Sequence, residues 1–298
     1  MATKIPPEIL LPILEEDAQK DSLRNNYPWP YHHVCQYWHD VLVSSPMEWT
    51  YIKLRPSSEN SEQHERYDLA RSLLQLERSK GCPLTAYISG VEHHHSNRSY
   101  LATPYVFQES YRWKYVTISD GAIEPSSLLC ALSRSVHLET LLSPTCSYTG
   151  LFDVTQRLTL PNLRRLFMSP FRPANNILGS IHASLLETLE IDSQISITAL
   201  EAFLRASVPD KLTTLTIDRL GLRDEEVPLM RSSPQMCSRL KQLDIWFEDS
   251  SRTPALRQIV RLLTWVPRTG FALSSLSYVY TISIGRAPQV HVLTSWRC

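Results

Sequence analysis

The first fifty residues contain three short motifs in order: Ile5-Pro6-Pro7-Glu8-Ile9-Leu10, Val34-Cys35-Gln36-Tyr37-Trp38 and Ser44-Ser45-Pro46-Met47-Glu48-Trp49. The first motif predicts a helix start, because proline loses no hydrogen bond there and an early carboxylate meets the positive end of the helix dipole. Apolar residues continue at helical spacing through Leu14, and Pro12 is expected to kink or shorten this helix.

Further helical structure is expected after a polar linker over residues 15–26. A second helix over residues 31–43 would place five apolar residues on one face: Val34, Tyr37, Trp38, Val41 and Leu42. A short turn then carries Trp49. These apolar side chains exceed what so small a unit needs for its own core, which indicates a module with a partner surface.

The order of the three motifs resembles an F-box, in which an L-P-x-E-[IL] helix, a V-C-x-x-W helix and an S-x-P-x-L-W turn follow one another. The resemblance implies docking on a Skp-type adaptor and, through it, on a cullin of an SCF-type ubiquitin ligase. It implies that the adaptor surface is built or flanked by Pro6, Glu8, Ile9, Ile13, Val34, Trp38, Pro46 and Trp49. The sequence departs from the family at Gln36, at Glu48 and over residues 25–30, so adaptor binding itself stays open.

A pattern L-x-x-L-x-[IL] recurs through the rest of the chain. Its starts, which lie 23 to 28 residues apart, are Trp113, Leu138, Leu163, Leu186, Leu212 and Leu240. Leucine-rich repeats have periods of about 20–29 residues, each with one strand and a helical or loop return. We therefore expect an α/β chain with a helical module at 1–55, a hinge near 56–65, and a curved, mainly parallel repeat solenoid over 56–298.

Other elements are expected around these repeats. The pattern predicts a helix over 67–79, a strand over 83–88 and a closing strand over 276–284. Capping signals at Thr198 and at Thr253-Pro254 predict return helices over 198–208 and 255–265. The layout resembles fungal, basidiomycete-type F-box proteins with irregular repeats.

Alternation along each strand predicts which residues face a partner, since successive side chains point to opposite faces. The outward positions are Arg165, Phe167, Ser169, Thr188, Glu190, Asp192, Thr214, Thr216, Asp218, Gln242, Asp244 and Trp246. The acidic residues favour a basic protein segment, and Phe167 and Trp246 are the expected anchors.

Composition excludes several functional classes. Net charge is zero, with 30 basic and 30 acidic residues, so general attraction to nucleic acid or anionic membrane is not expected. The sequence has neither a transmembrane run nor a signal peptide at its start, so a cytoplasmic or nuclear protein is expected. The glycine loops that cradle phosphates are missing. No cofactor is expected.

Candidate catalytic and metal-binding groups are few. Consecutive His93, His94 and His95 cannot all reach one ion, and the carboxylate clusters 15–17 and 224–226 are expected to be solvated. The six cysteines are scattered and predicted to be buried free thiols, with Cys35 in a helix core. We therefore expect a non-catalytic receptor subunit that binds an unknown target protein. The alternatives are a repeat scaffold without ligase association and an enzyme with an unfamiliar site.

Overall fold

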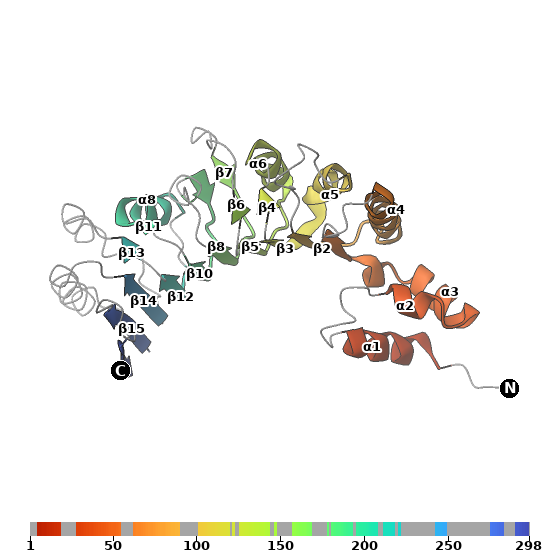
Figure 1. Cartoon of the computed structure of the whole chain (residues 1–298), viewed down its shortest axis with the longest axis horizontal. Coiled ribbons are helices and arrows are strands. Elements are labelled where there is room, and N and C mark those ends of the chain that lie inside the picture. Colours follow the sequence, from red (N-terminus) through yellow and green to blue (C-terminus); the bar gives the residue numbers. More distant parts are fainter. Residues whose placement is uncertain are drawn as a thin grey trace.

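The fold is described from a computed structural model of the chain. The described residues are 5–18, 28–54, 62–89, 101–119, 121–122, 125–143, 146–147, 157–168, 178, 180–192, 195–207, 211–217, 220–221, 242–248, 275–282 and 290–297. They form a mixed α/β structure in which a small helical module precedes a long, mostly parallel sheet (Figure 1).

The helical module comprises α1 (Pro7–Ala18), α2 (Trp29–His32), α3 (Gln36–Ser44) and the 3-10 turn η1 (Pro46–Trp49). The predicted helix start at Pro7 is confirmed. Pro12 lies inside α1 without ending it, so the helix continues through residues 15–18, where a linker was predicted. Their backbone groups stay within the helical hydrogen-bonded ladder, which the polar side chains leave intact.

The single helix predicted over residues 31–43 is wrong. The backbone at Cys35 is extended, with φ −161° and ψ 165°, and it separates α2 from α3. Val34 therefore leaves the face it was expected to share and becomes exposed. The core of the module consists instead of Leu10, Leu14, Val41, Leu42 and Trp49.

A ten-stranded sheet forms the rest of the molecule. Its order is β1-β2-β3-β5-β8-β10-β12-β14-β15-β16, so each strand is added beside the one before it. All pairs are parallel except β15 with β16. The strands are β1 (Tyr51–Leu54), β2 (Leu84–Ser89), β3 (Trp113–Ser119), β5 (Thr140–Ser143), β8 (Arg165–Met168), β10 (Thr188–Ile191), β12 (Thr214–Ile217), β14 (Gln242–Glu248), β15 (Ser275–Ile282) and β16 (Val290–Arg297).

Each of the six predicted repeat strands is present, as are the strands predicted over 83–88 and 276–284. Two strands of this ten-stranded sheet were not predicted. β1 begins inside the segment assigned to the helical module, so the sheet starts at Tyr51, and β16 closes the far edge in the antiparallel direction. Strand β1 is only four residues long, which is too short for its alternation to stand out in the sequence.

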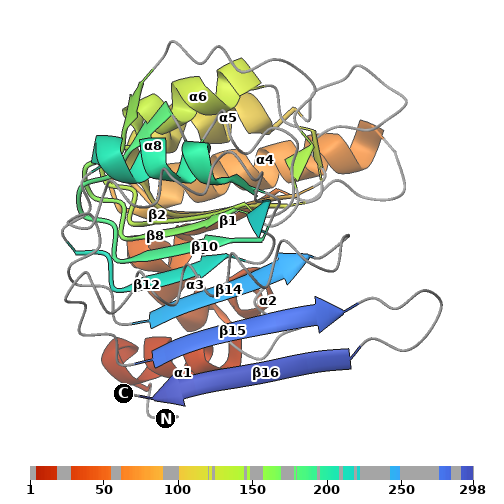
Figure 2. The ribbon, with the colours of Figure 1, turned by 90° about the vertical axis from the view of Figure 1, so that its left-hand side faces the viewer.

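The described helices that follow the module cover one side of the sheet (Figures 1 and 2). They are α4 (Glu62–Arg78), α5 (Thr103–Gln108) with the 3-10 turn η2 (Glu109–Arg112), α6 (Pro125–Arg134) and α8 (Ile197–Ser207). The helices predicted near 67–79 and 198–208 are confirmed as α4 and α8; the one predicted over 255–265 lies outside the described residues.

Three two-stranded parallel pairs repeat on this side of the molecule. They join β4 (Gly121–Ala122) to β6 (Cys146–Ser147), β7 (Leu158–Thr159) to β9 (Ile181–His182), and β11 (Ile195–Ser196) to β13 (Leu220–Gly221). Neighbouring parallel strands of the main sheet need a crossover connection between them, and these short pairs belong to the connections on the helix side of the sheet.

The main core lies between the sheet and the helices. One register row of buried side chains runs across seven strands, through Ile52, Ala86, Val116, Leu141, Leu166, Leu189 and Leu215. Alternate residues point to the opposite side, which we call the inner face. In Figure 1 the sheet bends around this inner face, with the helices on the outside.

Candidate protein-interaction surfaces

Helix α1 carries two apolar stripes with different environments. Leu10 and Leu14 are buried, with exposures of 1% and 2%, whereas Ile9 and Ile13 are 55% and 51% exposed. Residues four apart share a helix face, so the two isoleucines form one continuous outward stripe that Ile5 extends. Pro6 and Glu8 beside it are also exposed. The Tyr37 hydroxyl of α3 donates to the Ile5 carbonyl and holds the start of this stripe.

Exposed apolar residues also lie elsewhere on the module. Val34 is 57% exposed and Met47 is 61% exposed. The exposure of Met47 was not predicted from the sequence. Met47 lies in a short turn motif, which has no helical or strand periodicity from which a face could be assigned. Trp38 and Pro46 are half-buried. Of the predicted adaptor residues, Pro6, Glu8, Ile9, Ile13 and Val34 are thus open to a partner.

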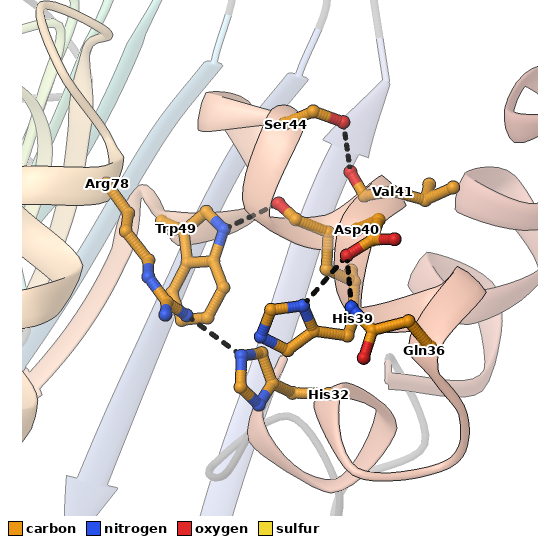
Figure 3. A network of polar contacts seen from close by, with 9 residues as sticks. His32, Gln36, His39, Asp40, Val41, Ser44, Trp49 and Arg78 are labelled. Atoms are coloured by element: carbon orange, nitrogen blue, oxygen red, sulfur yellow. Dashed lines mark hydrogen bonds and ion pairs between the residues drawn. The ribbon is translucent and has the colours of Figure 1, made fainter.

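Trp49 requires a correction, because its side chain is 0% exposed and cannot contact an adaptor. Its Nε1 donates a 2.8 Å hydrogen bond to the Leu42 carbonyl, and the Trp29 ring meets it edge-on at 5.3 Å. The Arg78 guanidinium of α4 lies 4.3 Å from the centre of the Trp49 ring. Trp49 therefore supports the module from within and joins it to α4 (Figure 3).

His32 completes this junction, which we define by Trp29, His32, His39, Trp49 and Arg78. Arg78 donates a hydrogen bond to His32 Nε2 over 3.2 Å, which places the histidine proton on Nδ1. That buried Nδ1 has no hydrogen-bond partner among the described residues. The His39 ring lies 4.2 Å away, and Asp40 Oδ1 lies 3.2 Å from His39 Nδ1.

The junction favours a neutral His32. Burial lowers the pKa of His32 below its usual value of 6.5, and the positive charges of His39, Arg78 and His33 lower it further. Burial also lowers the pKa of Arg78, an effect that Glu77 opposes. An arginine remains charged at neutral pH, so the Arg78 cation lies against the Trp49 ring and a neutral His32.

The inner face of the sheet presents the residues that the alternation predicted. Arg165 is exposed, and Phe167, Glu190 and Asp192 are half-buried. An ion pair joins Arg165 to Glu190, with 3.8 Å between Nη2 and Oε1. Register pairs the half-buried Thr216 with Asp244, and Trp246 with Val279. The side chains of Asp244 and Trp246 lie outside the described residues, as do Asp218 and Ser169.

The same face includes residues of the first strands that sequence reasoning missed: Tyr51, Lys53, Tyr87, Tyr115 and Leu142. The Lys53 ammonium lies 5.3 Å from the centre of the Tyr87 ring, and Ser119 donates a 2.9 Å hydrogen bond to the Tyr87 hydroxyl. In the sequence, Ile52 and Leu54 alternate with Tyr51 and Lys53, and this period-2 pattern was the feature that could have indicated strand β1. These residues were assigned instead to the helical module that precedes the sheet.

Charged residues lie at the starts of four neighbouring strands, β3, β5, β8 and β10, and form a ladder across them. Glu139, Arg164 and Glu187 each donate a backbone hydrogen bond of 2.8–2.9 Å to the equivalent residue of the strand before, beginning at Lys114. Their side chains form ion pairs, Lys114 with Glu139 at 3.6 Å and Arg164 with Glu187 at 3.0 Å. Repeat spacing thus creates a ladder of alternating charge, and exposed pairs of this kind contribute little stability.

The described residues contain no group of three or more metal-binding side chains. Cys35 and Cys130 are exposed and Cys82 is half-buried, so the prediction of buried thiols is wrong for the first two. Cys35 loses its place in a helix core because the chain is extended there. Residues 15–17 lie in the last turns of α1, while residues 93–95 and 224–226 are outside the described residues.

None of the described helices is both long enough and apolar enough to cross a membrane. No protein-family model matches this sequence, and comparison with curated proteins finds no match. The resemblance to an F-box protein therefore rests on the three motifs and the repeat spacing.

Proposed function

We propose that this chain is a substrate receptor of an SCF-type ubiquitin ligase, with the helical module docked on a Skp-type adaptor and the sheet binding a target protein. The observation that carries the proposal is the exposed stripe of Ile9 and Ile13 beside a buried stripe on the same helix. A stand-alone module gains nothing from leaving these side chains in water, whereas an interface buries them.

The proposed mechanism is proximity rather than bond chemistry. The adaptor and its cullin would hold one end of the chain, while the sheet holds the target near a ubiquitin-charged enzyme bound elsewhere. This arrangement raises the effective concentration of target lysines at the ubiquitin thioester. In this role the sheet would be an irregular leucine-rich-repeat solenoid, and the protein would work in the cytoplasm or nucleus, with no cofactor and no nucleic acid or membrane partner.

Adaptor binding tests the proposal directly. Purified full-length chain is immobilised, and binding of a purified Skp-type adaptor is measured for wild type, for the double variant Ile9→Asp/Ile13→Asp, and for Val136→Asp. Val136 is an exposed apolar residue of the sheet unit and is the matched control. Circular dichroism checks the fold of each.

We expect the double variant to lose adaptor binding by more than about a hundredfold, because two carboxylates would be desolvated in the interface. Val136→Asp should bind like wild type. Equal binding by all three chains, or no binding by wild type, would refute the docking proposal.

The second candidate is a repeat scaffold that does not join the ligase. It is favoured by Glu48, which replaces the leucine of the family motif, and by Gln36, whose amide donates to Asp40 over 2.6 Å. A wild-type chain that binds no adaptor but still binds a protein segment would establish this candidate.

A further inference from the structure

The junction holds together two units that the main chain joins at a single residue. The helical module ends at Trp49 and β1 begins at Tyr51, so Thr50 is the link between them. Helix α4, which follows β1, reaches back to the module and places the Arg78 guanidinium on the Trp49 ring and beside His32 (Figure 3). The orientation of the module on the sheet therefore depends on the contacts that α4 makes with it.

The hydrogen bond between Arg78 and His32 requires a neutral histidine. A guanidinium has no acceptor, so Arg78 donates and His32 Nε2, 3.2 Å away, supplies a lone pair. Protonation of the ring places a hydrogen on this lone pair, and two donors of like charge then face each other. One proton on His32 thus replaces an attraction with a repulsion.

The groups that act on His32 come from its own helix and from the elements packed against it. Burial has the largest effect in lowering the pKa of His32, followed by His39 on α3, Arg78 on α4 and His33 at the end of α2. On the side of η1, His32 meets the uncharged Trp49 ring edge-on, with 6.0 Å between the ring centres. Among the described residues, the side chains that shift this pKa are basic, so a positive ring gains no compensating charge from them.

The carboxylates of this region act on other groups. Asp40 Oδ1 lies 3.2 Å from His39 Nδ1. Glu77 is exposed, and it opposes the lowering of the Arg78 pKa that burial causes. A protonated His32 would therefore face the cation of α4 rather than a carboxylate.

We infer that the junction is a pH-sensitive switch: protonation of His32 releases α4 from the helical module, which then turns about Thr50 while both units stay folded. Each unit has its own hydrophobic core, so the release unfolds neither of them. The hydrogen bond from Gln75 to the Tyr51 carbonyl lies on the sheet side of Thr50 and persists in the open form. The inference goes beyond the proposed function, because it concerns the two units of this chain whichever partner the module binds.

The pH range follows from the direction in which the pKa of His32 is shifted. This pKa is lowered in the closed junction and returns toward its usual value of 6.5 when the ring is freed. Opening takes up one proton, so the ratio of open to closed chains rises by about tenfold for each pH unit between about 6.5 and the lower pKa of the closed form. The contact of Arg71 with the Trp29 ring, at 5.5 Å, does not titrate in this range and opposes the release.

Two exposed cysteines on opposite sides of the junction can carry the spin labels for the experiment. Cys35 lies between α2 and α3, and Cys130 lies on α6. In the full-length parent chain the other four cysteines are replaced by serine: Cys82, Cys146, Cys237 and Cys298. Double electron–electron resonance measures the distance between the two labels in samples frozen at pH 8.0, 6.5 and 5.5.

Three variants of the parent chain separate the switch from a general effect of acid. His32→Gln keeps an oxygen that accepts from Arg78 and does not titrate. Arg78→Ala removes the donor. The matched control is His137→Gln, which removes an exposed histidine between α6 and β5.

We expect the parent chain to show one distance at pH 8.0 and, at pH 5.5, a second and broader population whose ratio to the first has risen by about tenfold. His32→Gln should keep the first distance at every pH, whereas His137→Gln should respond like the parent. Arg78→Ala should show the broader population already at pH 8.0.

Three results would overturn the inference. The first is a parent distance that is unchanged between pH 8.0 and pH 5.5. The second is an equal change in His32→Gln. The third is a loss of the helical circular dichroism signal of the parent over the same pH range, which would mean that the chain unfolds rather than opens.

Discussion

Single residues at the junction between the module and the sheet have roles that their sequence neighbours do not share. Trp49 lies between Trp29 and Arg78, whereas Met47, two residues earlier, is open to solvent. His32 accepts a hydrogen bond from Arg78, whereas His33 beside it is exposed. The contribution of a single side chain to stability depends on its desolvation. Burial shifts the pKa of an ionisable group and raises the free-energy cost of a polar group without a hydrogen-bond partner.

The His32 environment predicts a pH dependence of stability. Because the folded pKa of His32 is lowered, the unfolded chain binds the proton more readily. The stabilising contribution is complete above the unfolded pKa of about 6.5 and is lost as the pH falls below it toward the folded pKa. We expect the melting temperature to fall between pH 7.5 and pH 5.5, and to fall less in His32→Gln. Thermal circular dichroism measures the melting temperature of each chain. An equal fall in both chains would show that His32 is not responsible.

We expect the protein to become more stable when Lys80 is replaced by glycine. It has a positive φ of 50° in the turn that ends α4, a conformation that costs an ordinary residue about 1 kcal/mol more than glycine. Lys80 is exposed, so its side chain contributes little packing. We expect Lys80→Gly to raise the free energy of unfolding by about 0.5 kcal/mol, because added unfolded-state entropy offsets part of the relief. Urea denaturation measures this change, and a decrease would contradict it.

At the scale of elements, each strand of the sheet contributes a buried row and an inner row. Leu189 and Ile191 of β10 face the core, while Thr188 and Glu190 face the inner side. The helices pack on the buried row, so a helix such as α8 depends on a few large side chains. Phe203 is the largest fully buried residue of α8.

The change in the free energy of unfolding caused by Phe203→Ala therefore measures how strongly α8 stabilises the sheet. Phe203→Ala removes a buried ring and leaves a cavity, which typically costs about 3–5 kcal/mol. We expect a loss in this range by urea denaturation. The matched control is Ala202→Ser, which changes the exposed neighbour on the same helix and should shift the free energy of unfolding by less than about 0.5 kcal/mol. A small effect of Phe203→Ala would mean that α8 is not part of the cooperative core.

At the scale of the whole molecule, two hydrophobic clusters are described, one in the helical module and one under the sheet. Contacts from α4 join them: Arg78 stacks on Trp49, Arg71 lies 5.5 Å from the Trp29 ring, and Gln75 donates to the Tyr51 carbonyl over 3.0 Å. In the proposed ligase this junction would set the direction in which the target is presented to the ubiquitin-charged enzyme.

The junction predicts the cooperativity of unfolding. Arg78→Ala removes the stacking on Trp49 and leaves His32 Nε2 without its donor. We expect scanning calorimetry to show one transition for wild type and an earlier, separate transition of the helical module in Arg78→Ala. Lys211→Ala, at an exposed and distant position, is the control. A single transition at the wild-type temperature in Arg78→Ala would show that other contacts couple the two units.

Local patterns in the sequence determined the helix start at Pro7, the strands of the six repeats and their spacing. Each depends on residues within a few positions of one another, such as proline at a first turn or leucines at alternate strand positions. The alternation also identified Arg165, Phe167, Glu190 and Asp192 as inner-face residues.

The tertiary structure decided which apolar residues meet water and which strands lie side by side. Ile9 and Leu10 are equally apolar neighbours, and only the packing of α1 against α3 and η1 buries one and leaves the other exposed. Trp49 is internal because α4 covers it, and Tyr51, Tyr87 and Tyr115 lie on neighbouring strands because β1 to β3 are aligned in register. These contacts join residues far apart in the chain, so no local pattern contains them.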